Sequence, residues 1–200
     1  MSDMTTSRIE VSEVEASSST KALGFWIYLM TDCILFAALF ATYIILRNGT
    51  AGGPSGHDIF DMPSVLAETL LLLTSSFTCG LAVIASKNNR KRLVLALLSL
   101  TFILGITFLA FELTEFIHLT QNGHSWQTSA FLSSFFTLVG THGLHISVGL
   151  LWIGVMVWQL KTRGFTEGVM RRLTLFSMFW HFLDIIWIFI FTIVYLMGVA

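Results

Sequence analysis

Long apolar stretches, separated by short polar ones, divide the chain into five parts. A helix needs about 20 apolar residues to cross the hydrocarbon core of a bilayer at a rise of 1.5 Å per residue. Five stretches reach that length, at about 22–46, 63–86, 93–119, 130–160 and 173–198. The pattern predicts an all-α integral membrane bundle of five transmembrane helices.

The polar stretches carry the signals of tails, turns and loops. Residues 1–21 are rich in Ser and Thr and lack the basic and apolar regions of a signal peptide, so we expect a disordered cytoplasmic tail. The membrane domain then covers 22–200. Residues 48–56 hold four glycines and a proline, which exclude a helix. A short polar turn is expected at 87–92 and a basic loop at 161–172.

Basic residues alternate across these stretches. The tail, the four connections and the C-terminus hold 2, 1, 4, 0, 4 and 0 Lys or Arg residues, in that order. Cytoplasmic connections of membrane proteins are enriched in basic residues. The alternation therefore predicts a cytoplasmic N-terminus and a periplasmic C-terminus.

Composition agrees with a membrane protein. The 200 residues are 54% hydrophobic and 12% charged, whereas a soluble domain carries about 25% charged residues. The net charge of −1 gives no basic field for nucleic acid, so no nucleic-acid partner is expected. The two cysteines form no CxxC or CxxCH motif, so neither a zinc site nor covalent haem attachment is indicated.

Several ionisable residues fall near the middle of the bilayer. Asp184 lies 12 residues after Arg172 and Asp32 lies 11 after Lys21, so both carboxyls are about 17 to 18 Å from the cytoplasmic edge. His181 precedes Asp184 by three residues and shares its helical face. An ionisable group at this depth is costly and needs a partner. We therefore expect one buried polar cluster, formed by Asp32, His142, His145, His181 and Asp184.

This cluster has three possible roles. It could be a hydrogen-bond network that fixes helix packing, or a path for protons. Alternatively, His142 or His145 could pair with His181 as the two axial ligands of a haem. The corresponding alternative functions are a b-type cytochrome with bis-histidine haem and a proton-coupled membrane carrier.

A second acidic set is expected at the outer helix ends. Three carboxylates close together cannot all ionise freely, so they need protons, histidine, lipid or a partner chain. The set is Glu68, Glu112, Glu115 and His118. The predicted helix at 130–160 carries small residues that are expected to allow close helix packing. These are Gly140, Gly143, Ser147 and Gly154.

Four motifs in order resemble the haem-copper oxidase subunit III family. WHFLDIIW at 180–187 resembles the family's WHFVDVVW signature, and GTHGLHI at 140–146 resembles its GxHGLHV helix. TDCILF at 31–36 resembles its buried carboxylate segment, and the Glu112-x-x-Glu115 pair followed by Phe116 resembles its acidic-aromatic helix end. Mitochondrial-type relatives of this family have seven helices and a glutamate at the position of Asp32. With five helices and an aspartate, the chain resembles the bacterial cytochrome o (bo-type) ubiquinol oxidase branch instead.

The resemblance implies a non-catalytic accessory subunit of a proton-pumping ubiquinol oxidase in the bacterial inner membrane. In this family, haem and copper lie in subunit I, so no cofactor, metal or catalytic residue is expected in this chain. The implied partners are subunit I, the other oxidase subunits and phospholipid. The implied role is to support assembly, lipid binding and sustained proton uptake by subunit I.

Overall fold

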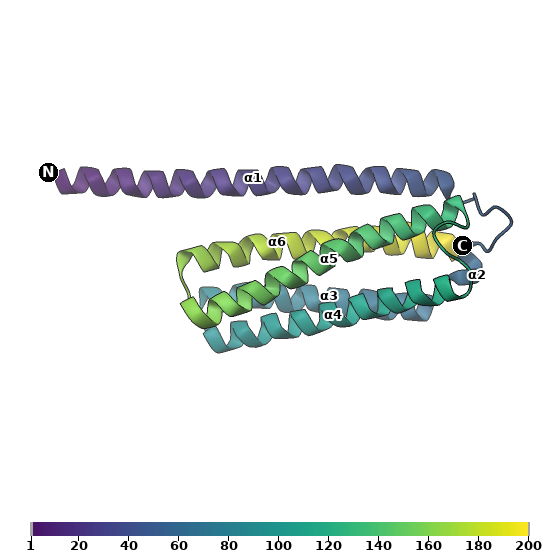
Figure 1. Ribbon diagram of the computed structural model, residues 1–200. Coiled ribbons are helices and arrows are strands. Elements are labelled where there is room, and N and C mark those ends of the chain that lie inside the picture. The colour runs from purple at the N-terminus through teal and green to yellow at the C-terminus, as the bar shows by residue number, and fades with distance from the viewer. Residues whose placement is uncertain (1, 200) are drawn as a thin grey trace. The chain divides into compact units, whose positions relative to one another are not determined.

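The computed structural model describes residues 2–199, and every regular element in that range is helical (Figure 1). Five helices in this range are long and apolar enough to cross a membrane, as predicted. The spans are Ala22–Leu46, Met62–Lys87, Lys91–Gln121, Ala130–Arg163 and Glu167–Val199. The fold class expected from the apolar pattern is therefore confirmed.

The chain forms two compact units, which are described separately. The first unit ends at Leu35 and the second runs from Phe36 to Ala200. Helix α1 (Ser2–Leu46) supplies all regular structure of the first unit and the first helical turns of the second. The α1 helix includes residues 2–21, where a disordered tail is expected from composition; that disorder stays a prediction.

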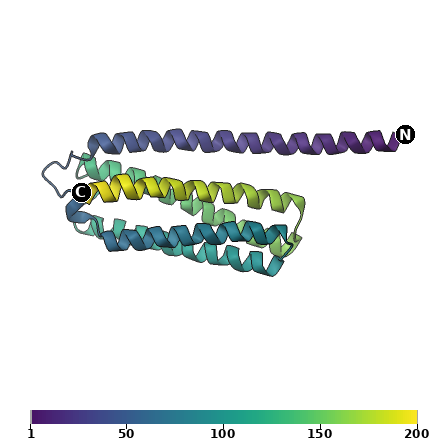
Figure 2. The ribbon, with the colours of Figure 1, turned by 180° about the vertical axis from the view of Figure 1, so that it is seen from behind.

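In the second unit, α2 (Gly56–Ile59) leads into the antiparallel pair α3 (Met62–Lys87) and α4 (Lys91–Gln121). These two helices lie side by side in both ribbon views (Figures 1 and 2). Pro63 falls in the first turn of α3, where its missing N–H is harmless. The tight turn between α3 and α4 contains Asn89 at a φ of 53°, a conformation that asparagine tolerates.

Helices α5 (Ala130–Arg163) and α6 (Glu167–Ile190) are joined by a shorter connection than expected. The basic loop predicted at 161–172 is wrong, since α5 continues to Arg163 and α6 begins at Glu167. Gly164, at a φ of 69°, ends α5, and the Thr166 hydroxyl accepts the N–H of Val169 to start α6. These local signals decide the boundary, because basic residues are also good helix formers.

The end of the chain departs from regular α-helix. A π-helical segment, η1 (Phe191–Leu196), follows α6 and is succeeded by α7 (Met197–Val199). The Tyr43 hydroxyl of α1 donates to the carbonyl oxygen of Val194 at 3.3 Å. The wider π turn brings Val194 and Tyr195 to fully buried positions.

Two tryptophans of α6 form hydrogen bonds with α3. The indole N–H of Trp180 donates to Ser75 Oγ at 3.1 Å, and that of Trp187 donates to Thr69 Oγ1 at 3.0 Å. Both indoles are fully buried. In a bilayer such bonds leave no polar atom facing hydrocarbon, so the two bonds fix the register of α6 against α3.

The Trp180 ring also determines how closely α4 and α5 approach α6. A Cβ at Gly149 of α5 would lie 2.7 Å from Cζ3 of this ring, and one at Gly105 of α4 would lie 3.1 Å from its Cη2. Real Cβ atoms do not come as close as 2.7 Å, so Gly149 is required, and 3.1 Å at Gly105 is tighter than nearly all real Cβ contacts, so a larger residue there would displace the ring. One buried indole thus defines the helix spacing on two sides.

We predict that Gly149→Ala destabilises the bundle by about 1 to 3 kcal/mol, because the added methyl displaces the Trp180 indole and strains its bond to Ser75. The measurement is the apparent free energy of unfolding of the purified protein in detergent. Gly154→Ala is the matched control on the same helix, since nothing lies within 4 Å of its added Cβ. Equal stability of the two variants would contradict the prediction.

Candidate functional site

At mid-depth the structure brings together His181, Asp184 and a residue of α3. The Nδ1 atom of His181 lies 3.7 Å from Oδ2 of Asp184 and 2.5 Å from the hydroxyl oxygen of Ser76. Asp184 is buried, whereas 44% of the His181 side chain is exposed. The pair predicted from the three-residue spacing therefore exists, and it opens toward the outside of the bundle between α3 and α6.

His142 occupies different surroundings. Its ring is fully buried and lies against three aromatic rings, with centroid separations of 5.3 Å to Trp187, 6.0 Å to Phe108 and 6.4 Å to Phe36. Neither ring nitrogen has a hydrogen-bond partner among the described residues. His142 therefore acts within this chain as a packing residue between α1, α4 and α6.

His145, one turn further along α5, faces toward α1. Its Nδ1 lies 2.7 Å from the carbonyl oxygen of Thr141, and its ring packs on Phe36 at 5.2 Å between centroids. Asp32 belongs to the first unit, where it interacts with Tyr28 one turn earlier on α1. The approach of Asp32 to Asp184, or to a histidine shared with it, stays a prediction.

The acidic set at the outer helix ends is a genuine cluster within the second unit. Glu68 of α3 and Glu112 of α4 are almost fully buried, at 1% and 2% exposure, and each has one oxygen without a hydrogen-bond partner among the described residues. Both lie close enough to Glu115 to interact with it electrostatically. The three carboxyls therefore interact with one another electrostatically, and the role predicted for them stays a prediction.

Gly143 explains how Glu112 fits inside the bundle. A Cβ at Gly143 of α5 would lie 2.5 Å from Oε1 of this glutamate. The close-packing role predicted for Gly143 is therefore confirmed, whereas the same role for Gly154 is wrong because that position faces open space. Gly143 provides the room that a buried carboxyl needs beside α5.

Tyr195 links the acidic cluster to the end of the chain. Its hydroxyl donates to Oε2 of Glu115 at 3.0 Å. The residue lies in η1, and the π turn rotates it toward α4. Hydrogen bonds to a carboxylate contribute about 1.5 to 3 kcal/mol, so this bond joins the C-terminal segment firmly to the acidic cluster.

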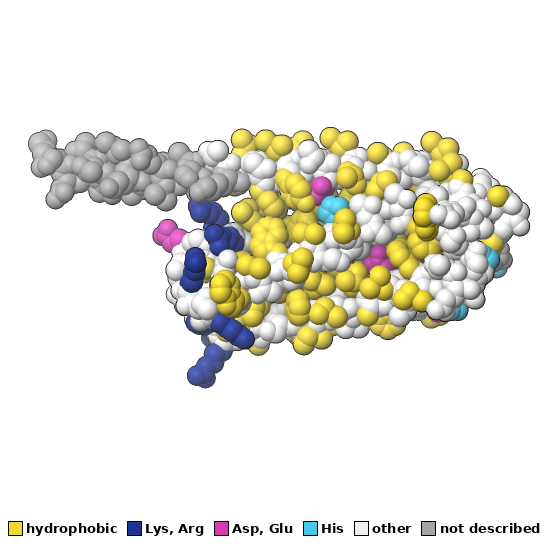
Figure 3. All heavy atoms as spheres, in the orientation of Figure 1, with side chains coloured by type: hydrophobic (Ala, Val, Ile, Leu, Met, Phe, Trp, Pro, Cys, Tyr) yellow, Lys and Arg dark blue, Asp and Glu magenta, His cyan; other side chains and the backbone are white. Residues whose placement is uncertain are grey.

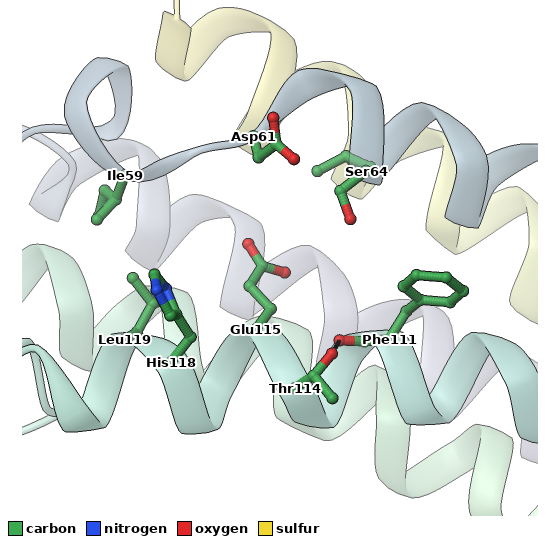
Figure 4. A pocket seen from close by; sticks show the side chains of 9 residues that line it. Ile59, Asp61, Ser64, Phe111, Thr114, Glu115, His118 and Leu119 are labelled. Carbon is green, nitrogen blue, oxygen red and sulfur yellow. Dashed lines mark hydrogen bonds between the residues drawn. The ribbon is translucent and has the colours of Figure 1, made fainter.

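A pocket of about 580 Å³ opens beside this cluster, between the first turn of α3 and the last turns of α4. Figure 4 shows Asp61 and Ser64 facing Glu115 and His118 across it. His118 is exposed and lies 3.4 Å from the side-chain nitrogen of Asn122. Its walls combine apolar residues with the carboxyl groups of Asp61 and Glu115, which suit a cationic or hydrogen-bonding group rather than an anion.

The histidines are poorly arranged for haem. A bis-histidine haem needs two imidazoles facing each other across an open space, but aromatic rings surround His142 and Ser76 binds Nδ1 of His181. Within residues 2–199, no three His, Cys, Asp or Glu side chains converge in a geometry that could hold a metal ion. The arrangement can accept and donate hydrogen bonds and protons.

Several residues of these sites are not apparent from the sequence. Ser76 and Tyr195 complete the two polar groups, and Thr69 and Ser75 accept the tryptophan N–H groups. A weak signal exists in α3, where hydroxyl residues recur through an otherwise apolar helix. Which of them face α6 depends on the rotation of α3, and that rotation is set by packing.

Comparison with known families gives one match along almost the whole chain. The family model described as cytochrome c oxidase subunit III matches residues 4–199. The match includes all five membrane-spanning helices and both polar groups.

Three curated relatives show the range of similarity. The cytochrome bo(3) ubiquinol oxidase subunit 3 of Pseudomonas aeruginosa is 55% identical over 182 residues, covering 91% of this chain and 87% of the relative. The quinol oxidase subunit 3 of Bacillus subtilis is 46% identical over 178 residues, covering 89% of this chain and 87% of the relative. The cytochrome c oxidase subunit 3 of Bacillus sp. (strain PS3) is 45% identical over 180 residues, covering 90% of this chain and 87% of the relative.

We predict that Tyr195 and Glu115 are energetically coupled by at least about 1 kcal/mol, because their hydrogen bond lies in a partly buried acidic cluster. A double-mutant cycle with Tyr195→Phe and Glu115→Gln measures this coupling as a non-additive change in the free energy of unfolding in detergent. The control cycle combines Tyr195→Phe with Glu167→Gln. Glu167 is an exposed residue in the first turn of α6. Additive effects in both cycles would disprove the coupling.

Proposed function

The chain belongs to the cytochrome c oxidase subunit III family, and we propose that it is the third, accessory subunit of a ubiquinol oxidase. The observation that carries this proposal is the match over 4–199, together with 55% identity to a bo(3) ubiquinol oxidase subunit 3 against 45% to a cytochrome c oxidase subunit 3. The higher identity favours ubiquinol over cytochrome c as the electron donor of the complex.

The subunit is a multi-pass protein of the bacterial inner membrane and is not an enzyme by itself. It is a non-catalytic part of an oxidoreductase complex whose haem and copper are held by subunit I. Its ionisable residues therefore serve packing, proton handling or contact with neighbouring molecules. The alternative of a b-type cytochrome has less support, since aromatic rings surround His142 and Ser76 binds Nδ1 of His181, and the family match favours an oxidase subunit over a proton-coupled carrier.

The orientation follows from the distribution of charge, with the N-terminus in the cytoplasm. Lys and Arg side chains gather at one end of the second unit (Figure 3). At that end the Lys91 ammonium donates to the carbonyl oxygen of Lys161 at 3.4 Å, so the α3–α4 turn and the α5–α6 connection lie side by side. The positive-inside rule assigns this end to the cytoplasm and the acidic pocket to the periplasmic side.

The partners of this subunit include subunit I and phospholipid. Asp61, Glu115 and His118 line a pocket near the outer membrane surface, at the depth where lipid headgroups lie. A carboxylate-lined pocket fits the ammonium group of a zwitterionic phospholipid. The apolar lining residues, among them Phe111 and Leu119, fit its acyl chains.

We expect the affinity-tagged chain, expressed with the other subunits, to purify together with a haem-containing subunit and to show a Soret band. The same chain expressed alone should be colourless, because its histidines form no haem site. Visible spectroscopy and mass spectrometry of both preparations test this. A Soret band that persists in the chain alone and disappears in His181→Ala would instead establish a b-type cytochrome.

We also expect Asp32→Asn to leave assembly intact but to shorten the time for which the complex sustains oxygen consumption. The reason is that an amide cannot carry a proton, while its shape is almost unchanged. The measurement is the decay of oxygen consumption during continuous turnover with a ubiquinol analogue. Glu167→Gln is the control, and identical decay in both variants would leave Asp32 as a packing residue only.

A further inference from the structure

The half-exposed imidazole of His181 lies in a groove between α3 and α6. The groove has a volume of about 350 Å³ and is otherwise lined by apolar residues, Ser76 and a glycine. Phe77 and Ile84 of α3 protrude beside it, at 66% and 58% exposure. Gly80 leaves its floor open, since a Cβ there would lie 3.8 Å from Nε2 of His181.

The depth of this groove makes the exposure of His181 unusual. His181 is 14 residues from the start of the span Glu167–Val199, and Ser76 is 14 residues from the start of Met62–Lys87. At 1.5 Å per residue, both positions are about 21 Å from a helix end, near the middle of the membrane. Lipid acyl chains cannot hydrogen-bond an imidazole, so exposure at this depth is costly unless protein covers it.

The hydrogen bonds made within the chain leave one side of the ring open. Nδ1 of His181 is paired with the Ser76 hydroxyl and lies near Asp184, whereas Nε2 lies over Gly80 on the groove side. Both Asp184 oxygens are buried behind the ring, so Nε2 is the polar atom of this pair that faces the groove. The exposed imidazole edge of His181 is therefore where a polar group from outside the second unit can bind.

We propose that a transmembrane helix of another oxidase subunit docks in this α3–α6 groove and presents a hydrogen-bonding side chain to His181. Small residues in the floor and large apolar side chains on the rim are typical of a surface that admits a second helix. The proposal rests on the role of the chain as a subunit of an oxidase complex. It further specifies that the partner contacts the α3–α6 groove and forms a hydrogen bond with His181.

The test places a photo-crosslinking amino acid at Phe77 in the intact complex in its native membrane. The control places it at Ile103 of α4, which is 59% exposed and also near the middle of its helix. We expect an adduct between this chain and another oxidase subunit, identified by mass spectrometry. Its yield should be at least about fivefold higher from Phe77 than from Ile103.

Substitution of His181 separates docking from folding. In the Phe77 crosslinking background, His181→Leu should lower the adduct yield about fivefold, while His181→Gln, which keeps a hydrogen-bonding group, should retain most of it. Circular dichroism and gel filtration of both variants check that the bundle still folds. An equal yield from the two variants would overturn the role of His181.

Other adducts would also overturn the proposal. These are an adduct with lipid only, with a second copy of this chain, or with residues 22–35 of the same chain. Absence of any co-purifying oxidase subunit would instead refute the proposed function. Co-purification without a Phe77 adduct would refute the docking site alone.

Discussion

The hydrogen bonds from the Trp180 and Trp187 indoles to α3 are the constraint on which the second unit depends. They lie two turns apart on α6 and are both fully buried. A bilayer gives no water to an indole N–H that loses its partner. The rotation of α6 is thereby fixed, and Gly105 and Gly149 then bring α4 and α5 against the Trp180 ring.

That rotation also decides where every other polar side chain of α6 points. With Trp180 and Trp187 directed inward, His181 turns toward the α3–α6 groove and Asp184 remains buried beside it. Trp187 at the same time packs on His142, which is thereby enclosed by aromatic rings. His142 thus takes a buried packing position while His181 faces an open groove, and the single cluster with Asp32 and His145 stays a prediction.

The sequence predicts those features that depend on one helix at a time. The number of membrane spans follows from length and hydropathy, and the His181–Asp184 pair follows from three-residue spacing. Most contacts between two helices are not predictable in this way, because the rotation of each helix is set by its neighbours. Ser76 and Tyr195 are examples, since their partners lie on other helices, and α6 begins earlier than its apolar run because Thr166 caps it.

Both polar groups remain incomplete within this chain, and that incompleteness fits an accessory subunit. Glu68 and Glu112 are buried with unpartnered oxygens, and the sequence supplies no Lys or Arg within any of its apolar segments to meet them. His181 is half-exposed at mid-depth, beside the buried carboxyl of Asp184. Such groups are costly in lipid alone. Of these groups, His181 is the one that a neighbouring molecule can reach, since 44% of its side chain is exposed, whereas the carboxyls are enclosed by the bundle.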